Sequence, residues 1–158
     1  MFSEEDIKWV HVYNINDTIL FRSNNDQDTL IVLEKNMYNP QNTFLLDCRG
    51  CNWLEGDNEF YAISAIDFKL LRRGYEYKGS FIIEKTDNDA PAKISFYLGG
   101  IYSKYNLPIK NQCVTLDRDV NAELGLYQDI IDLQNISYSK EEGITFYKTL
   151  SGQIYTKE

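Results

Sequence analysis

Residues 59–100 read EFYAISAIDFKLLRRGYEYKGSFIIEKTDNDAPAKISFYLGG, and this stretch decides the fold. Apolar side chains occupy alternate positions in three runs, which are separated by Arg72-Arg73-Gly74 and by the turn residues of Asp87–Pro91. Successive side chains of a β-strand point to opposite faces, whereas an amphipathic helix needs spacings of three and four. We therefore predict three antiparallel strands with one face on a core and the other face in water.

Each of the three runs supplies one apolar face, and together these faces are expected to form the core. The predicted core-facing residues are Phe60, Ala62, Ser64, Ile66, Phe68, Leu70, Tyr75, Tyr77, Gly79, Phe81, Ile83, Ala92, Ile94, Phe96 and Leu98. The remaining positions carry many charged or polar groups, as expected of a solvated face.

Further strands are predicted on the N-terminal side of this stretch. Alternation over Ile7–Tyr13 indicates a first strand, and Thr18–Arg22 indicates a second. Thr29–Lys35 is predicted as a third strand, whose run Leu30–Leu33 is apolar enough for burial on both faces. Thr43–Cys48 is predicted as one more strand before the central stretch.

On the C-terminal side, Ile101–Tyr105 is expected to continue the third central strand beyond Gly99-Gly100. Gln112–Leu116 is predicted as a short strand, and the chain ends in a hairpin of residues 144–147 and 154–155. Glu123–Leu133 fits either a helix or a strand, and we favour a strand because Gly125 costs about 1 kcal/mol inside a helix.

These patterns predict an all-β fold: an antiparallel meander of about nine or ten strands that forms a barrel or a sandwich, with at most one short helix. Consecutive hairpins favour the up-and-down arrangement. The 158 residues show no linker or change of composition, so a single domain over residues 1–158 is expected. A chain of this length buries roughly 70% of its unfolded surface, which supports a core without metals or disulfides.

Charge limits the classes of partner. The formal net charge is −8, which argues against binding to nucleic acid or to anionic membrane surfaces, because both need a basic footprint. The same charge permits a basic protein partner. No apolar run approaches the roughly 20 residues of a membrane span, and residues 1–6 are too acidic and polar for a signal peptide.

The three cysteines are Cys48, Cys51 and Cys113, so at least one of them stays unpaired within the chain. One Cys-x-x-Cys motif with a single histidine does not complete a four-ligand zinc site. A loop-like segment follows the motif, whereas a thioredoxin-type redox motif is followed by a helix. Structural thiols are expected, with one disulfide among these three cysteines as the alternative.

Two loops are candidate binding sites. Asp117, Asp119 and Asn121 reproduce the first half of a calcium loop, in which alternate residues direct hard oxygen ligands to one centre. Ala122 and Gln128 replace the glycine and glutamate that such a loop requires, which favours a solvated turn. In the loop after the cysteines, Trp53 with its neighbours stands between glycines and is a candidate anchor for a partner, the alternative being a tryptophan that covers one end of the sheet. The predicted partner-binding residues are Asn52, Trp53 and Leu54.

The sequence contains no motif that indicates a particular catalytic reaction. His11 is the only histidine, no Gly-x-Ser-x-Gly elbow occurs, and no glycine-rich phosphate loop lies between a strand and a helix. Pairs of carboxylates suited to glycoside hydrolysis arise by chance among 24 acidic residues, so the sequence selects none of them. We expect a protein that is not an enzyme and that needs no cofactor.

Both ends of the chain carry a family resemblance. The segments Tyr138–Tyr147 and Ser151–Tyr155, together with Tyr127–Ile131, are similar to the closing hairpin of small exported lipoproteins of the Bacteroidetes type. Trp9 and the segment Asp17–Phe21 resemble their opening hairpin. The resemblance implies a β-rich domain held in the cell envelope, in the periplasm or on the outer membrane, through a lipidated cysteine outside the present sequence. The acidic N-terminus leaves a cytoplasmic location as the alternative.

We therefore expect a non-catalytic cell-envelope domain that binds another protein, for instance an acidic inhibitor of a basic protein. The alternative is a lipocalin-like carrier that holds a small apolar ligand inside a barrel. Large rings that meet at the centre of the barrel favour the first interpretation, whereas a cavity of a few hundred Å³ favours the second. The rings expected there are those of Phe60, Phe68, Phe81 and Phe96.

Overall fold

The computed structural model describes residues 2–38, 62–86, 89–98, 101–102, 107–109, 111–118 and 131–158. Within this part of the chain there are one helix, α1 (Glu4–His11), and eleven strands, two of which have only two residues each. The strands are β1 (Thr18–Ser23), β2 (Asp26–Tyr38), β3 (Ala62–Arg72), β4 (Tyr75–Lys85), β5 (Lys93–Leu98), β6 (Ile101–Tyr102), β7 (Leu107–Pro108), β8 (Cys113–Asp117), β9 (Leu133–Ser139), β10 (Gly143–Thr149) and β11 (Ile154–Lys157).

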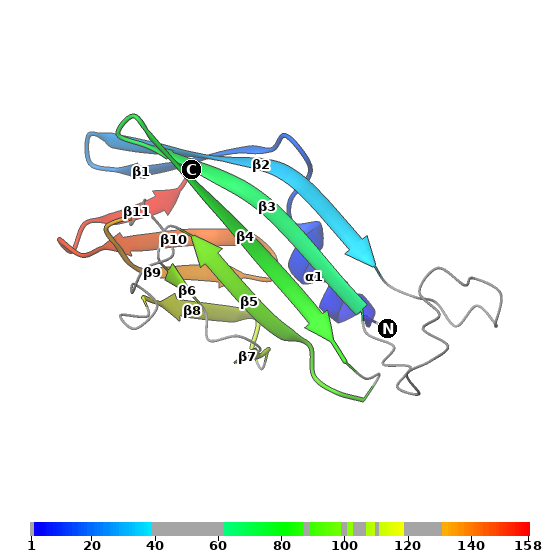
Figure 1. The fold of residues 1–158 in the computed structure, drawn as a ribbon. Helices are drawn as coiled ribbons and strands as arrows, with labels where there is room; N and C mark the ends of the chain where they lie inside the picture. The colour runs from blue at the N-terminus through cyan, green and yellow to red at the C-terminus, as the bar shows by residue number, and fades with distance from the viewer. Residues whose placement is uncertain are drawn as a thin grey trace, which may run out of the picture.

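One continuous sheet contains all of these strands and curves into a nearly closed barrel (Figure 1). Its strand order is β6-β5-β4-β3-β2-β1-β11-β10-β9-β8, with β7 paired to β5, and every pairing is antiparallel. From β1 to β6 and from β8 to β11, strands that follow one another in the chain lie side by side, and the first strand pairs with the last. The predicted all-β antiparallel fold is confirmed, and its form is the barrel.

The central stretch forms β3, β4 and β5, as predicted, with Ile66 opposite Phe81 and Phe81 opposite Phe96. Burial alternates along all three strands, so that the predicted apolar face lies inside the barrel. Tyr75 is the exception: it is 68% exposed because it lies at the tip of the β3–β4 hairpin. Phe60 lies outside the described residues.

Aromatic rings pack against one another inside the barrel, both along one wall and across from β4 to β9. Phe81 stacks on Tyr138 with 4.0 Å between ring centroids, and Phe68 lies 5.8 Å from Phe96. Tyr147 stacks on Tyr155 at 5.0 Å. Such ring pairs contribute about 0.5–1.5 kcal/mol each beyond the burial of their apolar area. The core is therefore a packed set of side chains contributed by both halves of the chain.

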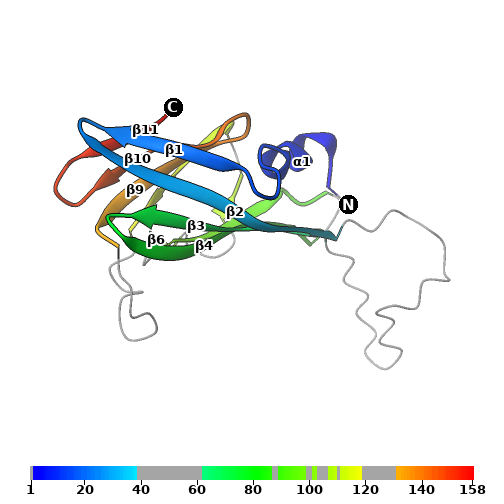
Figure 2. The same ribbon diagram turned by 90° about the horizontal axis from the view of Figure 1, so that it is seen from above.

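The prediction that Ile7–Tyr13 is a strand is wrong, because α1 occupies most of this segment. Ser3 caps the helix: its hydroxyl accepts a hydrogen bond from the Asp6 backbone, and the Asp6 carboxylate accepts one from the Ser3 backbone. This reciprocal capping box stabilises a helix start. Figure 2 shows α1 at the end of the barrel where β2 ends and β3 begins, and there Trp9 and Val10 are buried.

Two smaller predictions also need correction. The run Leu30–Leu33 is buried on one face only, since Leu33 is 42% exposed, and a register shift then follows between Val32 and Glu34. Ile101–Tyr102 does not continue β5 but folds back to pair with it in antiparallel fashion. The segment Thr43–Cys48 and most of Glu123–Leu133 lie outside the described residues. Within the described ranges, no helix has the length and apolar character that crossing a membrane requires.

Candidate functional site

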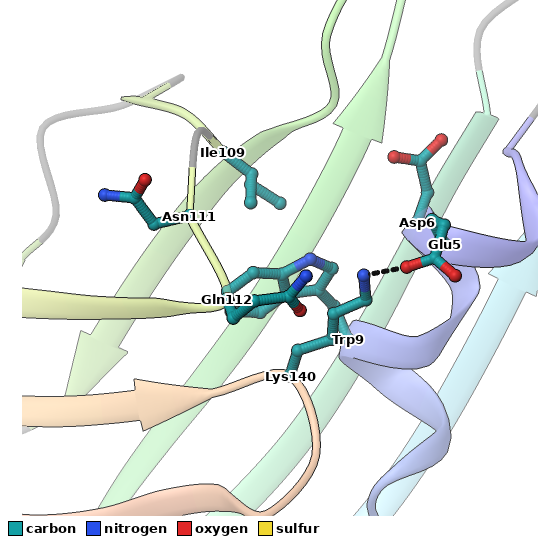
Figure 3. Close-up of a pocket in the computed structure, with 7 residues that line it drawn as sticks. All are labelled: Glu5, Asp6, Trp9, Ile109, Asn111, Gln112 and Lys140. Carbon is teal, nitrogen blue, oxygen red and sulfur yellow. Dashed lines mark hydrogen bonds and ion pairs between the residues drawn. The ribbon is translucent and has the colours of Figure 1, made fainter.

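An open pocket of about 370 Å³ lies beside α1, at the end of the barrel that this helix covers (Figure 3). Three parts of the chain line it: the first two turns of α1, the connection from β7 to β8, and the turn between β9 and β10. We call it the α1 pocket, and its lining residues are Glu5, Asp6, Trp9, Ile109, Asn111, Gln112 and Lys140.

The apolar part of the α1 pocket is firmly anchored. Trp9 is only 3% exposed, and its ring stacks on that of Tyr138 with 6.1 Å between centroids. The Tyr138 hydroxyl donates a hydrogen bond of 2.9 Å to the backbone carbonyl oxygen of Trp9. Across the pocket, the backbone N–H of Ile109 donates to the carbonyl oxygen of Ala92 at 2.9 Å. These contacts hold two apolar side chains at fixed places on the barrel rim.

Asp6 forms one charged side of the α1 pocket. Its Oδ2 atom accepts hydrogen bonds from the backbone and hydroxyl of Ser3, at 2.8 and 2.7 Å, and from Lys85 Nζ at 3.3 Å. Partial burial acts to raise the pKa of Asp6, but the Ser3 hydrogen bonds and the Lys85 charge outweigh it, so the pKa lies below its ordinary value. Asp6 is therefore ionised at neutral pH.

Glu5 and Lys140 form the second charged feature of the α1 pocket. The ammonium of Lys140, a residue only 8% exposed, donates a hydrogen bond to Glu5 Oε2 (Figure 3). The pKa of Glu5 is lowered to about 2, mainly by this hydrogen bond and secondly by the hydrogen bond from Lys8. The backbone N–H of Lys140 donates to the carbonyl oxygen of Gln112 at 2.9 Å, which fixes the turn against the pocket wall. The charged lining thus comprises two carboxylates and one ammonium.

A second polar cluster lies inside the barrel near the tips of the β1–β2, β3–β4 and β10–β11 hairpins. Asp28 is fully buried, and its Oδ2 atom accepts hydrogen bonds from Arg72 Nη1 at 3.0 Å and from the Tyr147 hydroxyl. Arg72 also pairs with Asp132 at 3.2 Å, and its guanidinium lies 4.7 Å from the centroid of the Tyr155 ring. Burial raises the pKa of Asp28 above its ordinary value. We assign this cluster a structural role, because it links β2, β3, β10 and the chain just before β9.

Asp28 also carries an unsatisfied atom. Its Oδ1 atom is buried and accepts no hydrogen bond from the described residues. Leaving a buried acceptor unpaired costs about 1–3 kcal/mol, which agrees in direction with the raised pKa of this carboxyl group.

The residues predicted from the sequence lie mostly elsewhere. Asn52, Trp53 and Leu54 are outside the described residues, as are Cys48 and Cys51. Cys113 begins β8 with an exposed, free thiol, 3.3 Å from the hydroxyl of Ser137. Cys113 therefore forms no disulfide in this structure. The state of Cys48 and Cys51 stays a prediction, as does the partner role of residues 52–54.

The predicted calcium loop is described only at its first residue. Asp117 is the last residue of β8 and is exposed, while Asp119 and Asn121 are outside the described residues. Among the described residues, no group of three or more histidine, cysteine, aspartate or glutamate side chains is placed to hold a metal ion. His11 is the last residue of α1, where it is exposed, and does not stand in a strand. The calcium site stays a prediction.

The residues of the α1 pocket carry no catalytic or ligand-binding motif in the sequence. One local signal was present, since Ser3 and Asp6 have the spacing of a capping box and therefore mark a helix start. Glu5 and Lys140 are 135 positions apart, so only the closure of the barrel brings them together.

Comparison of the chain with protein-family models, curated proteins and solved structures finds no match. The α1 pocket combines a fixed aromatic floor, ionised groups and access from solvent. These properties suit the binding of a polar or charged group.

Proposed function

We propose that this chain is a non-catalytic domain that binds another protein, and that the α1 pocket receives part of that partner. The observation that carries the proposal is the combination of an open, charged pocket at the barrel rim with a barrel interior filled by aromatic rings. We also propose a location in the cell envelope, for which the support is the resemblance of both chain ends to exported lipoproteins.

The electrostatics of the α1 pocket favour binding over acid–base catalysis. A general acid or base works best when its pKa is near the operating pH. The pKa of Glu5 is lowered to about 2, and that of Asp6 is also lowered. Both groups therefore stay ionised at neutral pH, where they attract a charged ligand but do not exchange protons with it.

The barrel shape is the observation that favours the alternative, a carrier of a small apolar ligand. A carrier needs an apolar cavity inside the barrel. In the described part of the structure, Phe68, Phe81 and Phe96 pack together on the neighbouring strands β3, β4 and β5. Phe81 also stacks on Tyr138 of β9, and α1 covers one end of the barrel. The α1 pocket itself is open and largely polar, so it fits a group on a protein surface better than an apolar molecule.

Photo-crosslinking from two surface positions tests the proposed function. The photoreactive residue p-benzoylphenylalanine would replace either Gln112, which lines the α1 pocket, or Gln134, an exposed residue of β9 outside it. Each protein would be irradiated in extracts of the cells that produce it. We expect a discrete crosslinked product from position 112 that excess wild-type protein abolishes and excess Gln112→Lys protein does not. Equal products from both positions, or none from position 112, would contradict the proposal.

A further inference from the structure

We infer that the group entering the α1 pocket is a lysine or arginine side chain of the partner. This inference rests on the proposed function and adds the chemistry of recognition. It follows from three features: a carboxylate oxygen of the pocket that is free to accept, an apolar path to it, and the negative net charge of the chain.

Asp6 offers the accepting oxygen. All hydrogen bonds that the described residues donate to its carboxylate end on Oδ2. A carboxylate accepts about four hydrogen bonds over its two oxygens, so Oδ1 keeps its capacity for a donor from outside. A cationic donor suits this oxygen best, because hydrogen bonds between an ionised donor and a carboxylate are about twice as strong as neutral ones.

Trp9 and Ile109 provide the apolar path. Figure 3 shows Ile109 and Asn111 on one side of the α1 pocket and the two carboxylates on the other, with Trp9 and Gln112 between them. Lysine and arginine bury an aliphatic stem along apolar surface while the charged head stays at a polar rim. The exposed amides of Asn111 and Gln112 add carbonyl acceptors at the mouth of the pocket.

The net charge of the whole chain favours a cation over an anion. Lys140 is the one group of the lining that would attract an anion, but its ammonium is buried against Glu5 and already donates to it. The lining carries two carboxylates and one ammonium, and Lys85 and Lys8, which lie outside the lining, also pair with Asp6 and Glu5. The whole chain carries −8, which raises the local concentration of a basic partner.

Four short peptides test the inference with the full-length protein. They share the form acetyl-Gly-X-Gly-amide, where X is lysine, arginine, norleucine or glutamate. Binding would be followed by NMR through the indole N–H of Trp9 and the side-chain amides of Asn111 and Gln112. We expect saturable shifts of these signals with lysine and arginine, weaker shifts with norleucine, and none with glutamate. Equal shifts with norleucine and lysine, stronger shifts with glutamate, or no shifts with any peptide would overturn the inference.

Charge variants locate the binding. Asp6→Asn should weaken the lysine peptide about threefold, while Glu4→Gln, which removes a charge from the same helical turn outside the pocket, should leave its affinity nearly unchanged. Because Asp6 also caps α1, a second pair of variants avoids the cap. Gln112→Glu should tighten the lysine peptide and Gln134→Glu should not. Identical affinities for these two variants would overturn the assignment to the α1 pocket.

The two experiments separate the inference from the proposed function. If a partner crosslinks from position 112 but no cationic peptide binds, the inference of a lysine or arginine ligand is wrong. The proposal that the pocket binds a protein is then still supported. Absence of both results would remove both proposals.

Discussion

At the scale of single residues, Gly143 occupies a position where both the backbone conformation and the packed core exclude a larger side chain. It has φ of +72°, and a Cβ atom built there would overlap the phenol ring of Tyr13. That ring is held by a hydrogen bond of 2.7 Å from the Ile144 backbone to the Tyr13 hydroxyl. An L-residue with a side chain therefore meets both a left-handed backbone and an occupied site.

We expect Gly143→Ala to lower the free energy of unfolding by roughly 3 kcal/mol, from backbone strain and overpacking together. Gly74→Ala is the matched control, since Gly74 has φ of +82° but nothing within 4 Å of a built Cβ. It should lose only about 1 kcal/mol. Chemical denaturation of the two variants measures the difference, and equal losses would show that the Tyr13 contact does not constrain this site.

The ion pairs of Glu5 predict a dependence of stability on pH. The pKa of Glu5 falls from 4.5 to about 2 on folding, so these pairs stabilise the fold above about pH 5. Their contribution is lost as the pH falls through the folded-state pKa. The difference in thermal midpoint between the wild type and Glu5→Gln should therefore shrink between pH 6 and pH 2.

Because Glu5 is exposed, this difference should be small and should fall further in high salt. Glu4→Gln removes a charge from the same turn without breaking an ion pair among the described residues, and its midpoint relative to the wild type should change less with pH. A difference for Glu5→Gln that stays constant across this pH range would contradict the account.

The sequence supports single-residue predictions only where neighbours in the chain decide the outcome. Cys113 proved to be exposed and Asp28 to be buried, and no local sequence pattern predicts the burial of either residue. The pairing of Asp28 with Arg72 joins residues 44 positions apart. Contacts of this kind depend on which strands become neighbours in the sheet, and a local sequence pattern does not predict strand order.

At the scale of elements, β3, β4 and β5 were predictable because each keeps a strict alternation of burial over six to eleven residues. The helix α1 was mistaken for a strand because Trp9, His11 and Tyr13 alternate with other residues over a short window. The sequence also contains a signal for a helix, the capping box of Ser3 and Asp6. Inspection of alternating apolar positions does not detect such a cap. In a segment of only eight residues, the helix cap and the burial of Trp9 favour a helix more strongly than the alternating pattern favours a strand.

The same cap gives a prediction for α1. Ser3→Ala removes the hydroxyl that accepts a hydrogen bond of 3.1 Å from the Asp6 backbone, and it should cost about 1 kcal/mol of helix stability. Ser3→Thr keeps a capping hydroxyl and should lose much less. Hydrogen exchange of the backbone amides of α1 measures both. Equal protection in the alanine and threonine variants would mean that packing of Trp9, and not the cap, holds the helix.

At the scale of the whole molecule, the choice between a barrel and a sandwich was beyond the sequence. Both architectures use the same alternation and the same hairpins. The pairing of β1 with β11, in which Phe21 lies opposite Lys157, joins the two halves of the chain in one sheet, and the stacking of Phe81 on Tyr138 packs β4 against β9 inside it. These contacts join positions far apart in the chain, so they follow from the assembled sheet and not from any one segment.

A filled interior predicts that the protein does not carry apolar ligands. A fluorescent fatty acid titrated into the wild type should show no saturable increase in emission, because aromatic rings occupy the centre of the barrel. A carrier of known affinity serves as the positive control. Saturable binding at one site per molecule would instead support the carrier alternative and would place the ligand inside the sheet.

We propose that this barrel recognises a protein at the α1 pocket. The most direct test is the affinity of the crosslinked partner, once isolated, for two variants that each add a cation at an exposed glutamine. Gln112→Lys places the charge in the pocket, and Gln134→Lys places it on β9 outside the pocket. We predict that Gln112→Lys weakens binding by roughly tenfold or more, while Gln134→Lys stays within about twofold of the wild type. Unchanged affinity for Gln112→Lys would show that the partner does not bind at the α1 pocket.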